Sequence, residues 1–310
     1  MHGKDVNSEF VRISEITRLL GDQACDLSKP YKTLIGDDAA IINFQELKLN
    51  LFASDMMVEN IHFRTSYFTA TEIGYKSMAT NVSDMAAMGG FPRFATISLA
   101  CPRHFDMEAF YSGVKEACEE YGFHIAGGDL SSSEFIVVSV AMIGSSYSQP
   151  ILRSTAHIGD FIFVTGPLGG SSAGLELLLN DPHAAGPLVE KHKKPKARLA
   201  EAKAISRLKA TAMIDVSDGL LADLNHICEN SRLGASLENI PVADGSTISN
   251  ALHGGEDYEL IFSHCDPATV AMIFASADLA RPAQIGQLND SAMITLDGKG
   301  VEIEGFQHKF

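Results

Sequence analysis

Several common features are missing from this sequence, and each absence excludes a class of protein. The 310 residues contain no tryptophan, no Cys-x-x-Cys pair and only five scattered cysteines. Such cysteines indicate the reduced thiols of a cytoplasmic protein, with neither a disulfide framework nor a zinc site. No run of about 18 apolar residues occurs, and the first residues lack the apolar core of a signal peptide, so we expect no membrane span.

Positive charge is also scarce. The chain has 24 Lys and Arg residues against 39 Asp and Glu, which gives a formal net charge of −15 at pH 7. This balance argues against nucleic acid or an anionic membrane surface as the main partner. Hydrophobic residues make up 45% of the chain, which is enough for the core of one large domain or of two domains of ordinary size.

The usual phosphate-binding motifs are absent too. Neither Gly-x-x-x-x-Gly-Lys-Ser/Thr nor the kinase motifs His-Arg-Asp and Asp-Phe-Gly occur. The nearest segment is 166–174, a glycine-rich stretch that lacks the lysine. It is either a weak phosphate loop or a flexible turn between a strand and a helix.

Acidic turns are what the sequence has instead. Residues 212–214 have the pattern of an apolar strand end, and an apolar stripe at helical spacing begins at Leu220. Ser217 or Asp218 occupies the predicted N-cap of that helix. This arrangement places Asp215 and Asp218 beyond the end of a strand, where α/β sheets bind their ligands.

Four other segments have the same character. They are Gly36-Asp37-Asp38, Ser54-Asp55, residues 81–90 with Asp84 at a predicted helix start, and Gly127-Gly128-Asp129. One such turn is well explained as a helix cap, but five of them carry carboxylates that would repel one another if gathered in one place. Divalent cations relieve this repulsion, and Mg²⁺ held between aspartates and nucleotide phosphates is what phosphoryl transfer requires.

Helical and extended patterns are mixed in both halves of the chain. They predict two α/β domains, residues 1–148 and 149–310, divided near Gln149-Pro150. In the first half we expect a helix over 71–88, interrupted by its Val-Ser-Asp turn, and antiparallel strands over 94–100 and 135–143. In the second half we expect strands over 161–165 and 258–263, helices over 170–179 and 267–275, and short strands near Ile285 and Ile294.

Three features leave alternatives open. The basic segment 191–198 is either a solvated loop or a site for anions. Arg153 either steadies a terminal phosphate or makes a surface ion pair. His62 is either a satisfied polar residue or part of the site.

Taken together, the motifs resemble those of a known family. In chain order they are Gly-Asp-Asp-Ala-Ala, Ser-Asp-Met-Met-Val-Glu-x-x-His-Phe, Asn-Val-Ser-Asp-Met-Ala-Ala-Met-Gly, Gly-Gly-Asp, Asp-Val-Ser-Asp-Gly-Leu and Gly-Gly-Glu-Asp-Tyr-Glu-Leu. The set closely resembles the thiamine-monophosphate kinases, in the superfamily of aminoimidazole ribonucleotide synthetase. The match covers nearly the whole chain. The departures, Ala53, Asn60, Leu130 and Ala197, are peripheral to the carboxylates.

The resemblance implies a fold and a reaction. The fold is α/β (α+β) with two domains, in which the N-terminal halves of a homodimer form a shared β-barrel and a C-terminal α/β domain covers each site. The reaction is direct in-line transfer of a phosphoryl group from ATP to thiamine monophosphate, which gives thiamine diphosphate. The implied cofactors are ATP and several Mg²⁺ ions, with a monovalent cation as a further candidate.

The resemblance also implies the site residues. The residues implied in catalysis are Asp84, Asp215 and Asp218. The implied metal ligands are Asp38, Ser54, Asp55, Asp84, Asp129, Asp215 and Asp218. The implied nucleotide contacts are Ser54, Tyr111, Gly128, Arg153 and Ser217. The implied contacts with the thiamine end of the acceptor are His62, Glu256 and Phe306.

Three other readings compete with this one. Another enzyme of the same superfamily is the nearest rival, but a selenophosphate synthetase would need a reactive cysteine, and Cys25 lacks the glycine and lysine of that setting. A non-catalytic metal- or nucleotide-binding protein would share the fold and lack ATP turnover. An acidic dimerisation module would leave the five repeated turns without a cause.

Overall fold

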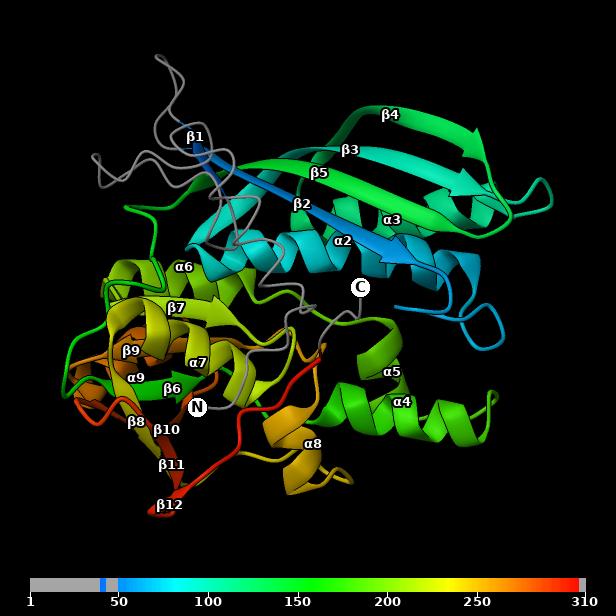
Figure 1. Ribbon diagram of the computed structural model, residues 1–310. Coiled ribbons are helices and arrows are strands. Elements are labelled where there is room, and N and C mark those ends of the chain that lie inside the picture. The colour runs from blue at the N-terminus through cyan, green and yellow to red at the C-terminus, as the bar shows by residue number, and fades with distance from the viewer. Residues whose placement is uncertain (1–39, 43–49, 307–310) are drawn as a thin grey trace, which may run out of the picture.

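The computed structural model describes residues 40–42 and 50–306, which form two β-sheets with helices on and between them (Figure 1). The Gly36-Asp37-Asp38 motif therefore lies outside the described residues, as does the predicted metal ligand Asp38. The first sheet belongs to the N-terminal half of the chain and the second to the C-terminal half, which confirms the expectation of two α/β halves.

The first sheet has five strands in the order β1-β2-β5-β3-β4. Its strands are β1 (Ala40–Ile42), β2 (Asn50–Val58), β3 (Gly90–Cys101), β4 (His124–Ser132) and β5 (Val137–Ser146). The predicted antiparallel pairing is present, because β3 runs against β5 with Phe94 opposite Ile143. β4 was not predicted and pairs with β3 in parallel. Over the described residues the sheet is open, with β1 and β4 at its edges, and forms no closed barrel within one chain.

Two helices, α2 (Ala70–Ala87) and α3 (Met107–Tyr121), cover one face of this sheet. α2 begins at a capping box, in which Thr69 accepts from the Glu72 N–H while the Glu72 side chain accepts from the Thr69 N–H. The predicted interruption at residues 82–84 is wrong, because α2 continues through these residues without a break to Ala87. Of its 18 residues, 14 are buried, so almost no side of this helix faces water.

The second sheet has seven strands in the order β12-β11-β8-β10-β6-β9-β7. Its strands are β6 (Phe161–Val164), β7 (Ala212–Asp215), β8 (Gly234–Leu237), β9 (Leu260–His264), β10 (Ala283–Asn289), β11 (Ile294–Leu296) and β12 (Lys299–Gly300). The helices of this half are α4 (Gly170–Asn180), α5 (Pro187–Lys193), α6 (Leu199–Leu208), α7 (Leu220–Ser231), α8 (Ile248–His253) and α9 (Pro267–Ser276). Of these, α5, α6, α8, β8 and β12 were not predicted.

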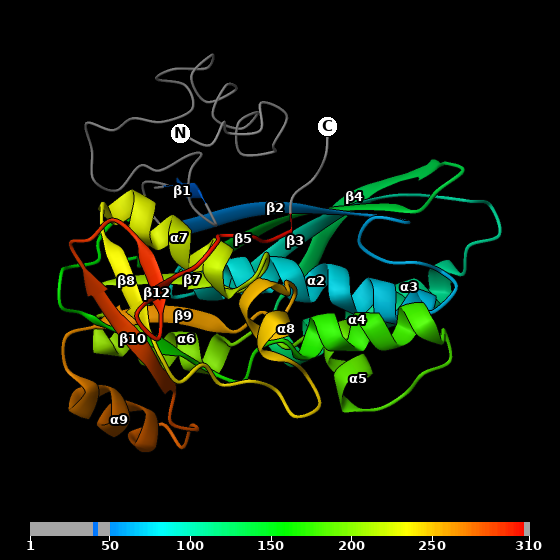
Figure 2. The same cartoon turned by 60° about the horizontal axis from the view of Figure 1, so that its bottom comes forward.

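The apolar cores join the two halves. One core lies under the first sheet and also contains Leu178 of α4 and Val189 of α5. A second lies within the C-terminal half. A third joins Ala86 and Ala87 of α2 to α6, β7, β9 and α9. α2 therefore packs on both sides, between the first sheet and the C-terminal half, as both views show (Figures 1 and 2). No helix among the described residues has both the length and the apolar character that crossing a membrane requires.

The face of the first sheet that points away from α2 and α3 carries exposed apolar side chains among polar ones. Met56, Phe94 and Ile143 lie on it and are 50%, 51% and 38% exposed. No described helix covers this face (Figure 1). Asp129 of β4 pairs with Ser98 of β3, so it lies on the same outer face.

Candidate active site

A cavity of about 420 Å³ lies between the two halves of the chain. Its walls come from β2 and the loop after it, from α2, from one side of α4, from α5 through His192, from the turn after β7 and from the loop before β9. The predicted residues that line it are Ser54, Asp55, His62, Asp84, Asp215, Ser217, Asp218, Glu256 and Phe306. Distant segments of the sequence therefore share one cleft.

Asp55 reaches the cleft from β2. It lies opposite the buried Val140 of β5, so its side chain points towards α2, where the Thr80 hydroxyl bonds to it. The Met56 N–H donates to Asp55 Oδ1 at 2.7 Å. Asp55 keeps some contact with solvent, but the protein around its carboxyl group displaces enough water to raise its pKa. The predicted turn at Ser54-Asp55 is wrong, because the ladder to β5 carries β2 on to Val58.

Asp84 reaches the cleft from the last turn of α2. The prediction that it stands at a helix start is wrong, because the capping box at Thr69 sets the start of this helix several turns earlier. Thr80 and Asp84 are four residues apart and therefore share one helix face, and both line the cavity. The helix thus supplies a rigid support for this carboxylate.

Asp215 is the last residue of β7, and its side chain is held by the N-terminal half. The Ser83 hydroxyl donates to Asp215 Oδ2 at 2.5 Å, and both residues are buried. The two Val-Ser-Asp units of the sequence therefore lie close together: the serine of the first unit orients Asp215, the residue just before the second unit. This contact ties α2 to the turn that carries Asp218.

The turn after β7 is fixed by Asp223, in the first turn of α7. The N–H groups of Ser217, Asp218 and Gly219 donate to Asp223 Oδ2 at 3.0, 3.0 and 3.1 Å. The predicted N-cap at Ser217 or Asp218 is wrong, because the N-cap is Gly219 and a carboxylate inside the helix accepts the amides instead. Burial, and then the charges of Asp218 and Asp215, raise the pKa of Asp223 well above its usual range.

Tyr258 shows that the carboxylates gather around one point. Its side chain is buried and lines the cavity. Burial raises its pKa well above the usual range, and the negative charges that add to this effect are Glu256, Asp55, Asp215 and Asp84. Within the described ranges, no three His, Cys, Asp or Glu side chains form a ready-made metal cage. Carboxylate oxygens are nevertheless the hard ligands that Mg²⁺ takes, and one or two carboxylates per ion suffice when water and substrate phosphates complete the shell.

The three residues expected at the acceptor's thiamine end line the same cavity. The Val58 N–H donates to His62 Nδ1 at 3.0 Å, which assigns the ring proton to Nε2. Glu256 is 26% exposed, and its Oε2 lies 2.9 Å from Lys76 Nζ. Phe306 is half exposed, and its N–H donates to the Asp218 carbonyl at 3.2 Å. The aromatic ring and the aspartate turn are therefore linked through the backbone.

Other predicted residues do not line this cavity in a single chain. Gly128 and Asp129 lie on β4, at the opposite edge of the sheet from β1 and beyond two strands from β2. The predicted turn at residues 127–129 is wrong, because these residues continue the strand that pairs with β3. Tyr111 lies on α3, and Arg153 precedes β6, where its carbonyl accepts from the Ser231 hydroxyl.

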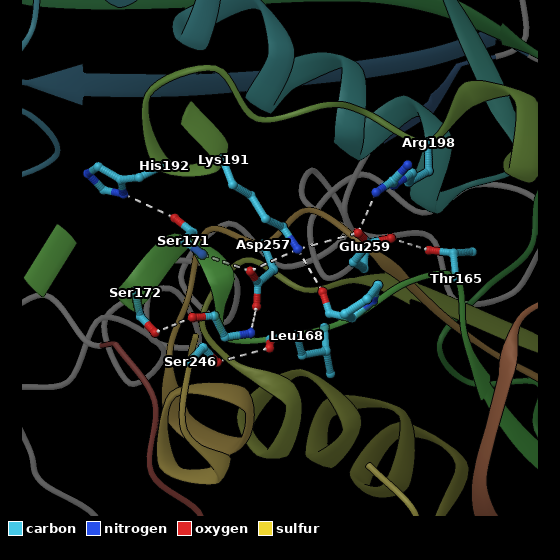
Figure 3. A network of polar contacts seen from close by, with 12 residues as sticks. Thr165, Leu168, Ser171, Ser172, Lys191, His192, Arg198, Ser246, Asp257 and Glu259 are labelled. Atoms are coloured by element: carbon cyan, nitrogen blue, oxygen red, sulfur yellow. Dashed lines mark hydrogen bonds and ion pairs between the residues drawn. The ribbon is translucent and has the colours of Figure 1, made fainter. Parts of the chain in front are cut away.

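Two N–H groups of the glycine-rich segment 166–174 are bonded to a carboxylate of the protein itself. Asp257 accepts from the N–H groups of Gly169 and Ser171, at 2.5 and 3.1 Å, at the start of α4 (Figure 3). The segment is therefore a turn between a strand and a helix, and the protein's own carboxylate fills the place that a phosphate would take.

The basic segment 191–198 is paired with carboxylates of the protein. Lys191 Nζ lies 3.4 Å from Asp257 Oδ1 and 3.6 Å from Glu259 Oε1, and Arg198 donates to Glu259 at 2.5 Å (Figure 3). Lys194 Nζ lies 2.5 Å from Glu116 Oε1. Lys191, Lys194 and Arg198 are thus paired within the protein, while Lys196 is exposed. The four side chains line a second cavity of about 490 Å³, so an anion site in this segment stays a prediction.

Sequence reasoning missed several residues that shape the cleft. They are Lys76, Thr80, Ser83, His192, Asp223 and Tyr258. Lys76 did carry a signal, because it is the only basic residue of the helix at 70–87. Ser83 carried one as well, since it belongs to the repeated Val-Ser-Asp unit, but the sequence did not show which carboxylate it would meet.

Comparisons with known proteins agree with this architecture. Residues 36–146 match the N-terminal domain of AIR synthase related proteins, and residues 157–299 match the C-terminal domain. Thiamine-monophosphate kinase of Aquifex aeolicus is 37% identical over 294 residues, 89% of this chain and 92% of that protein. The Bacillus subtilis kinase of the same name is 38% identical over 245 residues, 73% and 75% of the two chains. The solved structure of AaThiL complexed with AMPPCP and TMP is 34% identical, covers 99% of both chains and superposes with a TM-score of 0.86. The chain therefore belongs to the thiamine-monophosphate kinase family.

Proposed function

We propose that this protein transfers the γ-phosphoryl group of ATP to thiamine monophosphate, giving thiamine diphosphate and ADP. The observation that carries the proposal is the single cleft in which carboxylates from both halves face His62, Glu256 and Phe306. Support comes from the relatives, which are named for this activity, and from the related AaThiL structure, which was solved with AMPPCP and TMP.

The carboxylates around Tyr258 would hold the metal ions of this reaction. Asp55, Asp84, Asp215 and Asp218 would hold Mg²⁺, which when bound neutralises phosphate charge. Ser83 fixes one oxygen of Asp215, and Asp223 fixes the turn that presents Asp218. These contacts preorganise the ligands, so that little reorganisation is needed when substrates bind.

The acceptor would lie with its ring end at His62, Glu256 and Phe306. An aromatic face suits a flat, positively charged heterocycle. His62 would present Nε2–H to the ligand, because its Nδ1 is already used by the Val58 N–H. The acceptor phosphate is anionic near neutral pH, so its oxygen can attack the γ-phosphorus without a general base. The new P–O bond forms as the bond to the β-phosphate oxygen breaks and ADP leaves.

We also propose that two copies pair through the outer face of the first sheet. The exposed apolar side chains Met56, Phe94 and Ile143 support this, because an open apolar sheet face and an edge such as β4 favour association. Asp129 and Gly128 would then lie at or near the pairing surface, with Tyr111 and Arg153 as further nucleotide contacts. The division between the halves would fall at residues 148 and 149. Light scattering that shows a monomer at micromolar concentration would contradict the pairing.

One assay tests the reaction. The purified chain is mixed with ATP, Mg²⁺ and thiamine monophosphate, and we expect thiamine diphosphate and ADP in equal amounts, with loss of both when the metal is chelated. ATP chiral at the γ-phosphorus should give inverted product, and retention would indicate a phosphoenzyme. Efficient use of unphosphorylated thiamine would overturn the substrate. ATP turnover without either acceptor would favour another activity of the superfamily.

A further inference from the structure

Lys76 is a fully buried cation in the middle of α2. Its side chain has no exposed surface, and its Nζ lies 2.9 Å from Glu256 Oε2 and 5.3 Å from the centre of the Phe68 ring. Removing an ammonium group from water is strongly unfavourable unless a partner compensates for it. Within the described part of the chain, its one carboxylate partner is Glu256, on the loop before β9, so the ion pair crosses the boundary between the two halves.

Glu256 is held in an unusual position. Its φ is +63°, in the left-handed region that non-glycine residues rarely adopt, and its N–H donates to the Ser217 carbonyl at 2.8 Å. Its side chain is 26% exposed and lines the cavity. The loop therefore directs this carboxylate into the cleft beside the aspartate turn.

The ionisable groups of the protein contact only one of the two oxygens of the Glu256 carboxylate in the described residues. Lys76 Nζ and His192 Nδ1 both approach Oε2, at 2.9 and 3.3 Å, and among the described residues no such contact involves Oε1. His192 is buried, and its Nδ1 also lies 3.0 Å from the Ser171 hydroxyl (Figure 3). Burial, and then the charges of Lys76 and Lys193, lower the pKa of His192 to about 2, so the ring is neutral. The one full positive charge on Oε2 is therefore that of Lys76.

We propose that Lys76 is a positioning residue for recognition of the acceptor. By holding Oε2, it leaves Oε1 facing the cleft as a hydrogen-bond acceptor for an N–H group on the acceptor's ring system. It also balances the charge of Glu256, so this part of the site selects its ligand by hydrogen bonding and shape instead of by net negative charge. The inference rests on the proposed function, which supplies the acceptor.

The two possible roles of Glu256 predict opposite effects when Lys76 is removed. If Glu256 attracts the cationic ring by charge alone, loss of the nearby ammonium group strengthens that attraction and lowers the KM for the acceptor. If Lys76 orients Glu256, its loss lets the carboxylate turn away, and the KM rises. The sign of the change therefore distinguishes the two.

The experiment compares Lys76→Met with Lys193→Met. Both changes remove an ammonium group near the same Phe68 ring, but Lys193 pairs with Glu72 and does not contact Glu256. For Lys76→Met we expect the KM for thiamine monophosphate to rise about tenfold or more, with kcat within about threefold and the KM for ATP within about twofold. Lys193→Met should leave both KM values near those of the wild type. An unchanged or lower acceptor KM in Lys76→Met would overturn the proposal.

Two more variants separate positioning from a general loss of structure. Lys76→Arg keeps the charge and should recover part of the acceptor affinity. The double variant Lys76→Met/Glu256→Gln should be no worse than Glu256→Gln alone, because Lys76 acts through Glu256. Additive losses, or an equal rise in the KM for ATP, would show that the lysine merely supports the fold. If Lys76→Met does not fold, Lys76→Arg is measured in its place. A rise in the acceptor KM alone would support positioning, and an equal rise in the KM for ATP, or no rise in the acceptor KM, would overturn it.

Failure of the proposed function would be visible separately. If the wild-type chain neither binds thiamine monophosphate in calorimetry nor turns it over, the substrate assignment falls. The coupling of Lys76 to Glu256 can then still be measured from the melting temperatures of the wild type, Lys76→Met, Glu256→Gln and the double variant. If the wild type is active and the acceptor KM of Lys76→Met does not rise, only the role of Lys76 falls.

Discussion

Two helices of the C-terminal half, α4 and α7, each begin at a glycine-containing turn, and in each a buried aspartate accepts the turn's N–H groups. At α7 the acceptor is Asp223, from the first turn of the same helix. At α4 it is Asp257, which arrives from the loop before β9 and also pairs with Lys191. Both helices therefore lack the open N-terminus that would attract a phosphate.

The difference between the two turns lies in what the aspartate leaves exposed. Asp223 takes up the amides of its turn, and the side chains of Asp215 and Asp218 remain on the cavity wall. Asp257 takes up the amides at α4, and only serine and leucine side chains of that helix, from Ser171 to Leu179, reach the cavity. Similar backbone chemistry thus builds an acidic site at one turn and an inert wall at the other. The carboxylates beside a turn decide its function, more than its glycines do.

The largest effect is expected where the α7 turn faces the cavity. Asp215→Asn or Asp218→Asn should reduce phosphoryl transfer by about a thousandfold or more, because each removes a candidate metal ligand. The melting temperature without Mg²⁺ should hold or rise, since a like charge near Asp223 is removed. Turnover assays and thermal melts check both points, with the exposed Asp244→Asn as control. Near wild-type turnover would remove these residues from the site.

An intermediate effect separates the two capping aspartates. Asp223→Ala and Asp257→Ala should each lower the free energy of unfolding by about 2–4 kcal/mol, because each leaves buried amides without an acceptor. Only Asp223→Ala should also lower kcat strongly, by about a hundredfold, since its turn carries the metal ligands. Urea unfolding and steady-state kinetics on the two variants measure this contrast. Equal losses of kcat would show that the two turns contribute alike.

The smallest effect concerns His192, which bonds to Ser171 at the α4 turn and has no counterpart at α7. Its pKa is lowered to about 2 in the folded protein. At pH values between this pKa and the ordinary histidine pKa, the imidazole is therefore protonated only in the unfolded chain. Stability from this residue is therefore present at neutral pH and is lost as the pH falls. Between pH 7.5 and 5.5 the wild type should lose about 1.4 kcal/mol more than His192→Gln. Urea unfolding at both pH values tests this, with exposed His183→Gln as control, and an identical pH dependence in wild type and His192→Gln would contradict it.

Much of this architecture follows from local sequence, but several decisive contacts do not. The strand and turn at 212–219 were predictable because a short apolar run ends at a polar, glycine-containing turn. The Asp55 and Asp84 turns were mispredicted because the sheet ladder to β5 and the buried environment of α2 override the local preference of Ser-Asp for turns. The carboxylates that accept the N–H groups at the helix starts could not be predicted, for another reason. Asp257 lies 86 residues from Ser171, and nothing in either segment marks the pairing.

The near-complete burial of α2 has a consequence for how the chain unfolds. The helix packs on the first sheet on one side and on α6 and β7 on the other, and it bonds to the C-terminal half through Lys76 and Ser83. Unfolding of either half would remove the contacts on one side of α2, so we expect the two sheets to unfold as one cooperative unit. We then expect the amide hydrogens of this helix to exchange with solvent only when the whole protein opens, so that their exchange rate reports the global stability.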